Sequence, residues 1–319
     1  MTETPITSDS SQGTAGGNSS TLPIDPLWPR AAHLLREASL QDQDTTWDAA
    51  ILGIPAHLTS ISATNAHITP AAIRAALLRY STWSWEHRLD LGALAIGNFG
   101  DIQDPDSPAG EDRTASAVAQ LRQQAGLVVG LGGDNSVTYA MAMGAYGSDL
   151  PKSGLITFDA HHDLRDGISN GSPVRRLIEA GLDPKRIVQI GIADYSNSPE
   201  YAMRALELGI TVIPRSELRH KSPQEIMRQA LGIAGSGGGP IHVDIDVDVC
   251  DRSVVPACPA AAPGGISADE LRQFAYLAGC SPQVKSIDIT EIDASADSAD
   301  GRTIRLAALL ILETLAGRF

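Results

Sequence analysis

The sequence predicts an α/β fold whose core is a mostly parallel sheet of about eight strands. Short apolar runs recur along the whole chain, and each is bounded by Gly, Pro or Asp. Segments with the apolar spacing of helices lie between these runs. Strands that are apolar along their whole length must be covered on both faces, as they are in a parallel sheet flanked by helices. About eight such strands fit either a doubly wound open sheet or a barrel.

The predicted strands follow one another from residue 49 to residue 290. Helical spacing separates them, for example at Ala71, Ile73, Leu77 and Leu78 after the first run. The glycine-rich stretch 235–239 is expected to be a flexible loop before the seventh run. The runs are AAILGIP at 49–55, GALAIGN at 92–98, GLVVGLG at 126–132, SGLITFDAH at 153–161, RIVQIGIA at 186–193, ITVIP at 210–214, GPIHVDIDV at 239–247 and VKSIDIT at 284–290.

Length and composition favour one large soluble domain. With 319 residues and 43% hydrophobic content, the chain can bury a substantial core over residues 28–319. Residues 1–27 are mostly Thr, Ser, Gly, Asp and Pro, and we expect them to form a disordered tail. No apolar stretch approaches the ~20 residues that span a bilayer. The formal charge of −14, without any Lys/Arg block, argues against nucleic acid or an anionic membrane as partner.

The cysteine pattern favours a reducing compartment. Cys250, Cys258 and Cys280 are odd in number and form no CxxC pair. A disulfide framework is therefore not expected. We expect buried free thiols and a cytoplasmic protein instead.

Acidic residues gather where two of the predicted strands end. A lone DxD pattern more often caps a helix or lies in a solvated turn, but two of them at apolar strand ends, one with a histidine, favour a functional site. Packed carboxylates are unfavourable unless they are protonated, paired or bound to cations. Oxygen ligands with an imidazole suit Mn²⁺ better than zinc, and carboxylates can bridge two ions. Each set alternates along one strand face: Asp159, His161 and Asp163 in the first, and Asp244, Asp246 and Asp248 in the second.

A glycine-rich turn, GLGGDNS at 130–136, follows the third apolar run. Such a turn can cradle a phosphate or can offer side-chain oxygens to a metal. It lacks the Lys-Ser/Thr of a P-loop and the third glycine of a dinucleotide fingerprint. We therefore expect it to be part of a metal site.

With these motifs in view, the chain resembles the ureohydrolase family of arginases, agmatinases and formimidoylglutamases, from about residue 48 to the C-terminus. The resemblance implies a three-layer, arginase-like α/β/α fold, a binuclear manganese site and hydrolysis of an amidine or guanidine. It also implies a homo-oligomer, a trimer or a hexamer. The matching motifs are GGDNS at 132–136 (GGDHS in the family), DAHHD at 159–163 (DAHxD), DVDVCD at 246–251 (DxDxxD), NGSP at 170–173 (HGTP), TPAAIR at 69–74 (GPxAIR) and Glu291 in DITEID.

The same resemblance implies a role for each acid of the two sets except Asp244. Asp159 and Asp246 are expected to bridge the two ions. Asp163 is expected to complete the shell of the first ion and, with Glu291, to act in catalysis. His161 and Asp248 are expected to complete the shell of the second ion, and Glu291 to accept hydrogen bonds from the NH groups of the substrate.

Two asparagines depart from the family pattern. Asn135 stands where the family has a metal-binding histidine, and a neutral amide oxygen is a weak ligand. We expect it to be a poor ligand or a hydrogen-bond donor to metal-bound water, so that the first ion binds weakly or not at all. Asn170 replaces a histidine that is thought to shuttle protons. His162 lies on the opposite strand face from His161 and is expected in the surroundings of the site rather than on the metal.

Local details resemble the formimidoylglutamase branch most. DAHHDLR at 159–165, the run at 244–265 and DGRTIRLAA at 300–308 are similar to segments of that branch. The implied reaction is hydrolysis of N-formimidoyl-L-glutamate to L-glutamate and formamide, in histidine degradation. A substrate with two carboxylates needs a local cation, and the candidates are Arg165, Arg175 and Arg176, with Asn170 beside them.

Two alternatives stay open. An agmatinase, or another guanidino ureohydrolase that releases urea, would prefer carboxylates around its cationic substrate, and Asp166 and Asp194 could supply them. A catalytically impaired binding protein with the same fold is the alternative from a different class, because the Asn135 position has lost a metal ligand. A two-metal phosphoesterase is disfavoured, since Glu291 would repel a phosphate.

Overall fold

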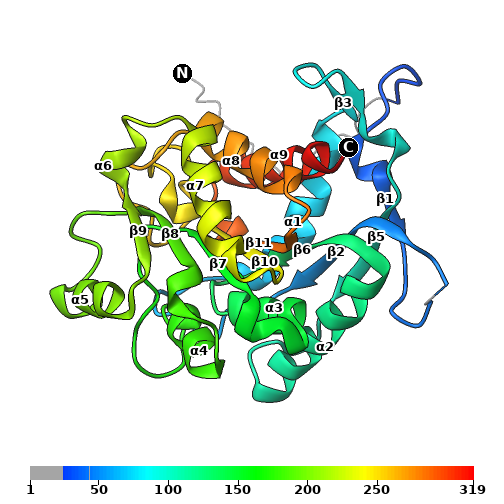
Figure 1. Ribbon diagram of the computed structural model, residues 1–319. Coiled ribbons are helices and arrows are strands. Elements are labelled where there is room, and N and C mark those ends of the chain that lie inside the picture. The colour runs from blue at the N-terminus through cyan, green and yellow to red at the C-terminus, as the bar shows by residue number, and fades with distance from the viewer. Residues whose placement is uncertain (1–23, 43) are drawn as a thin grey trace, which may run out of the picture.

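The computed structural model describes residues 24–42 and 44–319 of the chain (Figure 1). In this part, nine strands form one sheet in the order β1-β5-β2-β6-β11-β10-β7-β8-β9, and every neighbouring pair is parallel. The sheet is open, because β1 and β9 lie at its two edges. The strands are β1 (Leu35–Glu37), β2 (Trp47–Ile54), β5 (Ile96–Asp101), β6 (Ala125–Gly132), β7 (Gly154–Phe158), β8 (Ile187–Ile192), β9 (Thr211–Pro214), β10 (Ile241–Asp246) and β11 (Val284–Thr290).

Each of the eight apolar runs overlaps one strand of this sheet, so the predicted parallel α/β fold is confirmed and the barrel is excluded. The edge strand β1 was not predicted, because Leu-Arg-Glu is short and two of its three side chains are exposed. A small antiparallel hairpin, β3 (Trp83–Ser84) and β4 (Leu89–Asp90), was also missed. It lies outside the main sheet, where no apolar run marks it.

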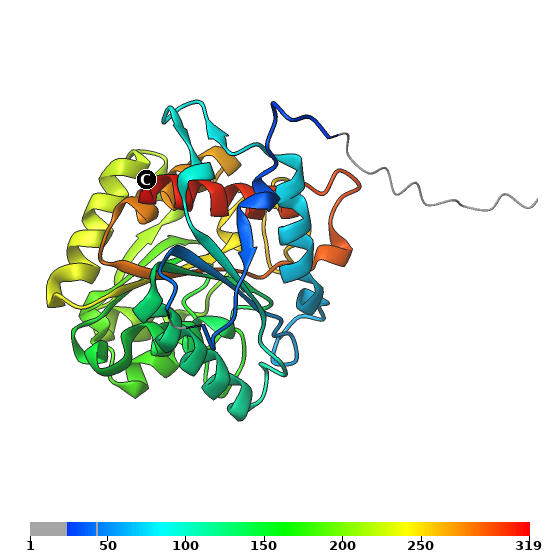
Figure 2. The ribbon, with the colours of Figure 1, turned by 90° about the vertical axis from the view of Figure 1, so that its right-hand side faces the viewer.

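Helices cover both faces of the sheet and make the fold three layers deep (Figures 1 and 2). One large apolar cluster fills the space between the sheet and each helix layer. The short helix α6 (Arg215–Leu218) follows β9. One layer contains α1 (Thr69–Ala76), α7 (Pro223–Ala234), α8 (Ala268–Cys280) and α9 (Arg302–Arg318), and the other contains α2 (Pro108–Gln124), α3 (Val137–Tyr146), α4 (Pro173–Ala180) and α5 (Pro199–Leu208).

Serine-proline pairs start several of these helices. The side chains of Ser107, Ser198 and Ser222 accept a hydrogen bond from the backbone N–H three residues ahead, and a proline follows each of them. Ser222 and Glu225 form a reciprocal capping box at the start of α7. Helix α4 ends at Gly181, whose φ of 119° suits a residue without a side chain. Local sequence therefore sets where the helices begin and end.

The central strands β6, β11, β10 and β7 are neighbours, and their carboxyl ends lie at the same edge of the sheet. The register is close: Asp246 at the end of β10 pairs with Thr290 at the end of β11, and Ile245 pairs with Phe158 at the end of β7. The residues that follow these strands must therefore lie together. In open parallel sheets this edge is where ligands bind.

The N-terminal residues and the cysteines can also be compared with the expectations from the sequence. Most of the predicted tail, residues 1–23, lies outside the described residues, and residues 24–27 are exposed. No helix in the described part of the chain is both long and apolar enough to cross a membrane. All three cysteines are free thiols, with Cys250 and Cys258 buried and Cys280 exposed.

Candidate active site

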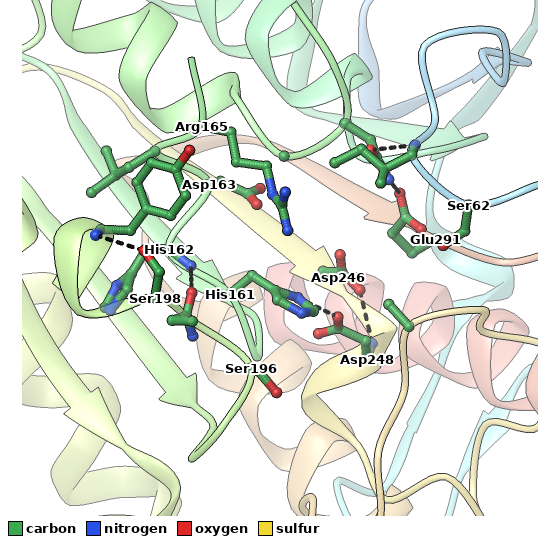
Figure 3. Close-up of a pocket in the computed structure, with 17 residues that line it drawn as sticks. Ser62, His161, His162, Asp163, Arg165, Ser196, Ser198, Asp246, Asp248 and Glu291 are labelled. Atoms are coloured by element: carbon green, nitrogen blue, oxygen red, sulfur yellow. Dashed lines mark hydrogen bonds and ion pairs between the residues drawn. The ribbon is translucent and has the colours of Figure 1, made fainter. Parts of the chain in front are cut away.

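A cavity of about 300 Å³ opens at the carboxyl ends of the central strands (Figure 3). Acidic residues, histidines, neutral polar residues and one arginine line it. Its polar lining residues are Ser62, His161, His162, Asp163, Arg165, Asn170, Ser196, Asn197, Ser198, Tyr201, Asp246, Asp248 and Glu291.

The end of β7 brings Asp159 and His161 against Asp248, which follows β10. The Nδ1 atom of His161 lies 2.8 Å from Oδ2 of Asp248 and 3.4 Å from Oδ1 of Asp159. Each of the three residues offers one ligand atom, and these atoms all lie within 4.8 Å of one another. Two carboxylates and an imidazole at this separation are a donor set that fits a divalent ion such as Mn²⁺.

Backbone N–H groups fix the orientation of these acids. The N–H of Asp248 donates to Oδ1 of Asp246 at 2.8 Å, and the N–H of Ala160 donates to Oδ1 of Asp248 at 2.8 Å. The buried Arg215 donates to the carbonyl oxygen of Asp248 at 2.7 Å. Sequence reasoning missed Arg215, which lies 33 residues from Asp248 along the chain.

The Asn135 side of the cluster is held by an amide. The Nδ2 group of Asn135 donates to Oδ2 of Asp163 at 2.5 Å. The amide oxygen accepts hydrogen bonds from the hydroxyls of Thr138 at 3.0 Å and Thr290 at 2.8 Å. With its oxygen so occupied and its N–H₂ directed at a carboxylate, Asn135 acts as a hydrogen-bond donor to an expected ligand. The expectation that it offers its oxygen to a metal does not agree with this geometry.

Glu291 lies directly after β11 and is buried in the cavity wall. Its Oε1 atom accepts hydrogen bonds from the N–H of Asn135 at 2.8 Å and from Nδ2 of Asn170 at 2.7 Å. No described residue donates to Oε2. Asn170 also accepts a hydrogen bond from the N–H of Ile61 at 3.0 Å, so it joins Glu291 to a loop of the cavity wall.

The backbone is strained at two of the acids. Asp163 has a φ of 53° and Glu291 has a φ of 63°, and both lie in the left-handed region that side chains other than glycine rarely adopt. Such strain persists only where the surrounding structure holds it, and it concentrates at functional sites.

The pKa values of the acids reflect crowding. Burial, together with repulsion from Asp163 and Asp248, raises the pKa of Asp159 far above its usual range. Burial and the Asp248 charge do the same to Asp246. Burial and the nearby buried Asp134 raise the pKa of Glu291 to about 8. A bound divalent cation would remove this cost by compensating the negative charges, so the acids fit the implied metal.

One ion pair relieves part of the crowding. Burial alone would lower the pKa of His161, but its hydrogen bond to Asp248 and the surrounding acids raise this pKa to about 9. The same hydrogen bond lowers the pKa of Asp248 in spite of the burial of that carboxyl. Without a metal, His161 is therefore the cation of the cluster.

Of the three arginines predicted to bind substrate, one lines the cavity and two do not. Arg165 lines the cavity, and no described carboxylate pairs with its guanidinium (Figure 3). Arg175 instead pairs with Glu179 at 2.5 Å and donates to the carbonyl oxygen of Arg165. Arg176 pairs with Glu111 at 2.7 Å. Neither lines the cavity, because partners on α4 and α2 satisfy both groups elsewhere, so the expectation that they bind substrate is corrected.

Other predicted residues take supporting positions. His162 contacts Gln189, with its Nδ1 atom 2.7 Å from Oε1, and burial lowers its pKa. Asp244 lies two residues before Asp246 in β10. It is buried opposite Asp288 of β11 and does not line the cavity. Asp166 pairs with Arg204 and is also outside the lining, as is Asp194.

The outer wall was missed by the sequence reasoning. Ser196, Asn197 and Ser198 follow β8, and Tyr201 lies in the first turn of α5. Asn197 accepts a hydrogen bond from the N–H of His162 at 2.9 Å. The signal was available, since these residues follow the carboxyl end of another strand of the same sheet.

Comparison with known proteins agrees with this architecture. The model of the arginase family matches residues 47–317. A formimidoylglutamase of Halalkalibacterium halodurans is 35% identical over 84% of this chain and 86% of its own length. That of Bacillus subtilis is 31% identical over 89% of this chain and 96% of its own length. A mitochondrial agmatinase of Gallus gallus is 28% identical over 84% of this chain and 80% of its own length.

Solved structures are similar over nearly the whole chain. The formimidoylglutamase of Bacillus subtilis superposes with a TM-score of 0.86 at 28% identity, and the match covers 94% of this chain and 95% of that one. The formiminoglutamase of Trypanosoma cruzi with Mn²⁺ superposes with a TM-score of 0.82 at 25% identity, covering 91% of this chain and 98% of that one.

Proposed function

The chain belongs to the arginase family, as its motifs predicted, and from this premise we propose that it hydrolyses N-formimidoyl-L-glutamate to L-glutamate and formamide. The reaction breaks a C–N bond of a linear amidine. The observation that carries this choice is Arg165, a cation without a carboxylate partner among the described residues, in the wall of a cavity that several acidic residues also line. A dianionic substrate matches both features, with its carboxylates toward Arg165 and its amidine toward the acids.

Two Mn²⁺ ions suit the acidic side. Asp159 and Asp246 are the shared ligands in this proposal, with Asp163 on the Asn135 side and His161 and Asp248 on the other side. When bound, such ions lower the pKa of water and polarise the C=N bond of an amidine. The relative from Trypanosoma cruzi whose structure contains Mn²⁺ supports this choice of metal.

Glu291 orients the substrate. Its Oε1 atom is held by Asn135 and Asn170, so Oε2 remains to accept a hydrogen bond from an amidine N–H. Two fixed donors on one oxygen restrict the rotation of the carboxylate, which reduces the entropy lost when the substrate binds. Asn170 takes part by holding Glu291 and the loop at Ile61.

Arg165 holds a substrate carboxylate. A guanidinium can donate two parallel hydrogen bonds to a carboxylate, and this pairing is stronger than one between neutral groups. The hydroxyl and amide groups of Ser196, Asn197 and Ser198 line the same cavity and supply neutral donors. Residues 196–198 carry no carboxylate, so a cationic chain such as that of agmatine would lack a partner there.

A substrate panel tests the proposal. The Mn-loaded chain is assayed with formimidoylglutamate, agmatine, arginine and 4-guanidinobutyrate, and bound manganese is measured on the same samples. We expect turnover of formimidoylglutamate with kcat/KM roughly 10- to 100-fold above that of the others, since an arginine contact with a carboxylate contributes about 1.5–3 kcal/mol. Preferential release of urea from agmatine would assign the agmatinase reaction. Bound metal without any turnover would assign a binding protein.

The arginine itself provides a sharper test. Arg165→Ala should raise KM for formimidoylglutamate by roughly 10- to 100-fold with little change in kcat, because the contact is made in the bound ground state as well. Arg219→Ala is the matched control, since it removes an exposed arginine that lies outside the cavity. An unchanged KM in Arg165→Ala would remove the dianionic substrate from the proposal.

A further inference from the structure

The loop that carries Arg165 has no helix or strand of its own. It follows Asp163, runs through the exposed residues 165–168 and returns to the cavity wall at Asn170. Gly167, in the middle of the loop, has a φ of 83°, and glycine loses more backbone entropy on being fixed than any other residue. Such a loop places a side chain accurately only where other residues hold its backbone.

Arg204 on α5 holds the loop on both sides of Arg165. Its Nη1 group donates to the carbonyl oxygen of Leu164 at 2.7 Å and to Oδ1 of Asp166 at 2.8 Å. The donors of a guanidinium have a fixed planar arrangement, so these contacts restrict direction as well as position. Arg204 also occupies the carboxylate of Asp166, which is next to Arg165 in the sequence.

Arg175 on α4 adds contacts from a second helix. Its Nε group donates to the carbonyl oxygen of Arg165 at 2.6 Å, and its Nη2 group donates to that of Gly167. Its Nη1 group pairs with Glu179 at 2.5 Å, and this pair holds the guanidinium in place. The two arginines together contact every residue from 164 to 167.

The side chain of Arg165 packs directly on Gly171. A Cβ atom at position 171 would lie 2.7 Å from Cδ and 3.1 Å from Nε of Arg165, which is closer than an ordinary van der Waals contact. Only a residue without a side chain therefore leaves room for the stem of Arg165. The N–H of Arg165 also donates to the carbonyl oxygen of Gly171 at 3.0 Å and closes the loop.

We propose that Arg175 and Arg204 are positioning residues, which hold the loop so that Arg165 presents its guanidinium to a carboxylate of the substrate. The side chain of Arg165 points into the cavity, and neither of the other two arginines lines it (Figure 3). A group held in its binding position before the substrate arrives loses less entropy on binding. This inference rests on the proposed function, because it takes Arg165 as the group that binds the carboxylate.

A double-mutant cycle on the Mn-loaded full chain, with formimidoylglutamate as substrate, tests the proposal. We expect Arg204→Met to raise KM by roughly 5- to 10-fold with kcat and bound manganese unchanged, because a displaced Arg165 weakens binding of the ground state. In the Arg165→Ala background the same change should alter KM by less than about 2-fold, since no guanidinium is left to position. Arg175→Met should behave in the same way.

Gly171→Ala probes the same side chain from the other direction. It should raise KM in the unaltered chain, because the added methyl group displaces Arg165. It should have no further effect in the Arg165→Ala background, where the side chain that it displaces is absent.

Arg186→Met is the matched control. Arg186 also pairs with an aspartate, Asp183 at 2.9 Å, and donates to a backbone carbonyl oxygen, that of Ser153 at 2.9 Å. It lies just before β8, at the amino end of that strand, and does not line the cavity. We expect its KM, kcat and manganese content to match those of the unaltered chain.

Hydrogen exchange measures the loop without any substrate. The amide of Arg165 should exchange at least ~10-fold faster in Arg204→Met and in Arg175→Met than in the unaltered chain, and at the unaltered rate in Arg186→Met. Mass spectrometry of the peptide that contains residues 164–168 reads this rate. Unchanged exchange in both variants would overturn the proposal, as would a rise of KM that is equally large in the Arg165→Ala background.

The two measurements separate this inference from the proposed function. If Arg165→Ala leaves KM unchanged, Arg165 binds no substrate carboxylate, and the proposed function fails together with the positioning role. If Arg165→Ala raises KM but Arg204→Met and Arg175→Met do not, the positioning role alone fails.

Discussion

The acid cluster has two sides that contain similar carboxylates but differ in the nitrogen-bearing side chain that contacts them. On the His161 side, an imidazole joins Asp159 and Asp248, and the three ligand atoms converge within 4.8 Å. On the Asn135 side, an amide donates its N–H to Asp163 and uses its oxygen for Thr138 and Thr290. The two sides therefore differ less in their carboxylates than in the side chain that completes each set, an imidazole that can ligate a metal on one side and an amide that donates to a carboxylate on the other.

Asp246→Asn should have the largest effect, because Asp246 is the acid proposed to serve both sides. We expect bound manganese to fall below one ion per chain and activity to fall by at least ~1,000-fold. Metal analysis after dialysis and kcat for formimidoylglutamate measure the two losses. Asp244→Asn is the control, since Asp244 lies two residues earlier on β10 and outside the cavity. Equal losses in the control would mean that any change in β10 disturbs the site.

Glu291→Gln probes the Asn135 side without touching a proposed metal ligand. The amide keeps nearly the shape of the carboxylate but loses the negative charge that orients the amidine, so we expect kcat/KM to fall by roughly 100-fold. Manganese content should stay at the level of the unaltered chain. A parallel loss of metal would show that Glu291 belongs to the metal site instead.

Asn135→His tests the comparison directly. The imidazole removes the amide donor from Asp163 and supplies the same type of ligand that the other side already has. We expect manganese affinity on this side to rise by about 10-fold or more, and affinity on the His161 side to stay the same. Calorimetric titration of the metal-free protein resolves the two steps. Unchanged affinity in both steps would show that residue 135 does not reach the ion.

The pH dependence of the metal-free protein gives the smallest effect. The pKa of Glu291 rises from 4.5 to about 8 on folding and that of His161 rises from 6.5 to about 9, so both groups bind protons more tightly in the folded state. As pH increases, the unfolded chain releases these protons first, and the free energy of unfolding therefore falls between about pH 4.5 and 9. Thermal unfolding in chelator should give a Tm that decreases from about pH 5 to about pH 8. Saturating Mn²⁺ should abolish most of this decrease, whereas a Tm that rises with pH in chelator would contradict the assignment of this dependence to Glu291 and His161.

The sheet and its acids could be predicted because both follow from local patterns. Apolar runs mark the eight long strands. Asp159, His161 and Asp163 were expected to alternate along a strand, but β7 ends at Phe158, so all three lie in the loop that follows it and only their place at the end of the strand was predicted correctly. Parallel strands carry their ends to a common edge, so acids far apart in the sequence meet without any knowledge of individual contacts. The short edge strand β1 and the β3–β4 hairpin lack such a pattern.

The directions of individual side chains could not be predicted, because distant partners decide them. Arg176 turns from the cavity toward Glu111, which lies 65 residues away in the sequence. The amide of Asn135 is oriented by Thr290, which lies 155 residues away. Arg165 and Arg176 are equally basic in the sequence, and only the ion pair of Arg176 with Glu111 of α2, a contact between distant residues, separates their roles.

The left-handed backbone at Asp163 and Glu291 limits how this protein can be made more heat-resistant. Glycine would relax the main chain at either position, so a screen that selects only for thermal tolerance would favour it there. The same replacement would delete a carboxylate that the proposed reaction needs. Libraries for industrial stabilisation should therefore hold these two codons constant and vary the helix layers instead.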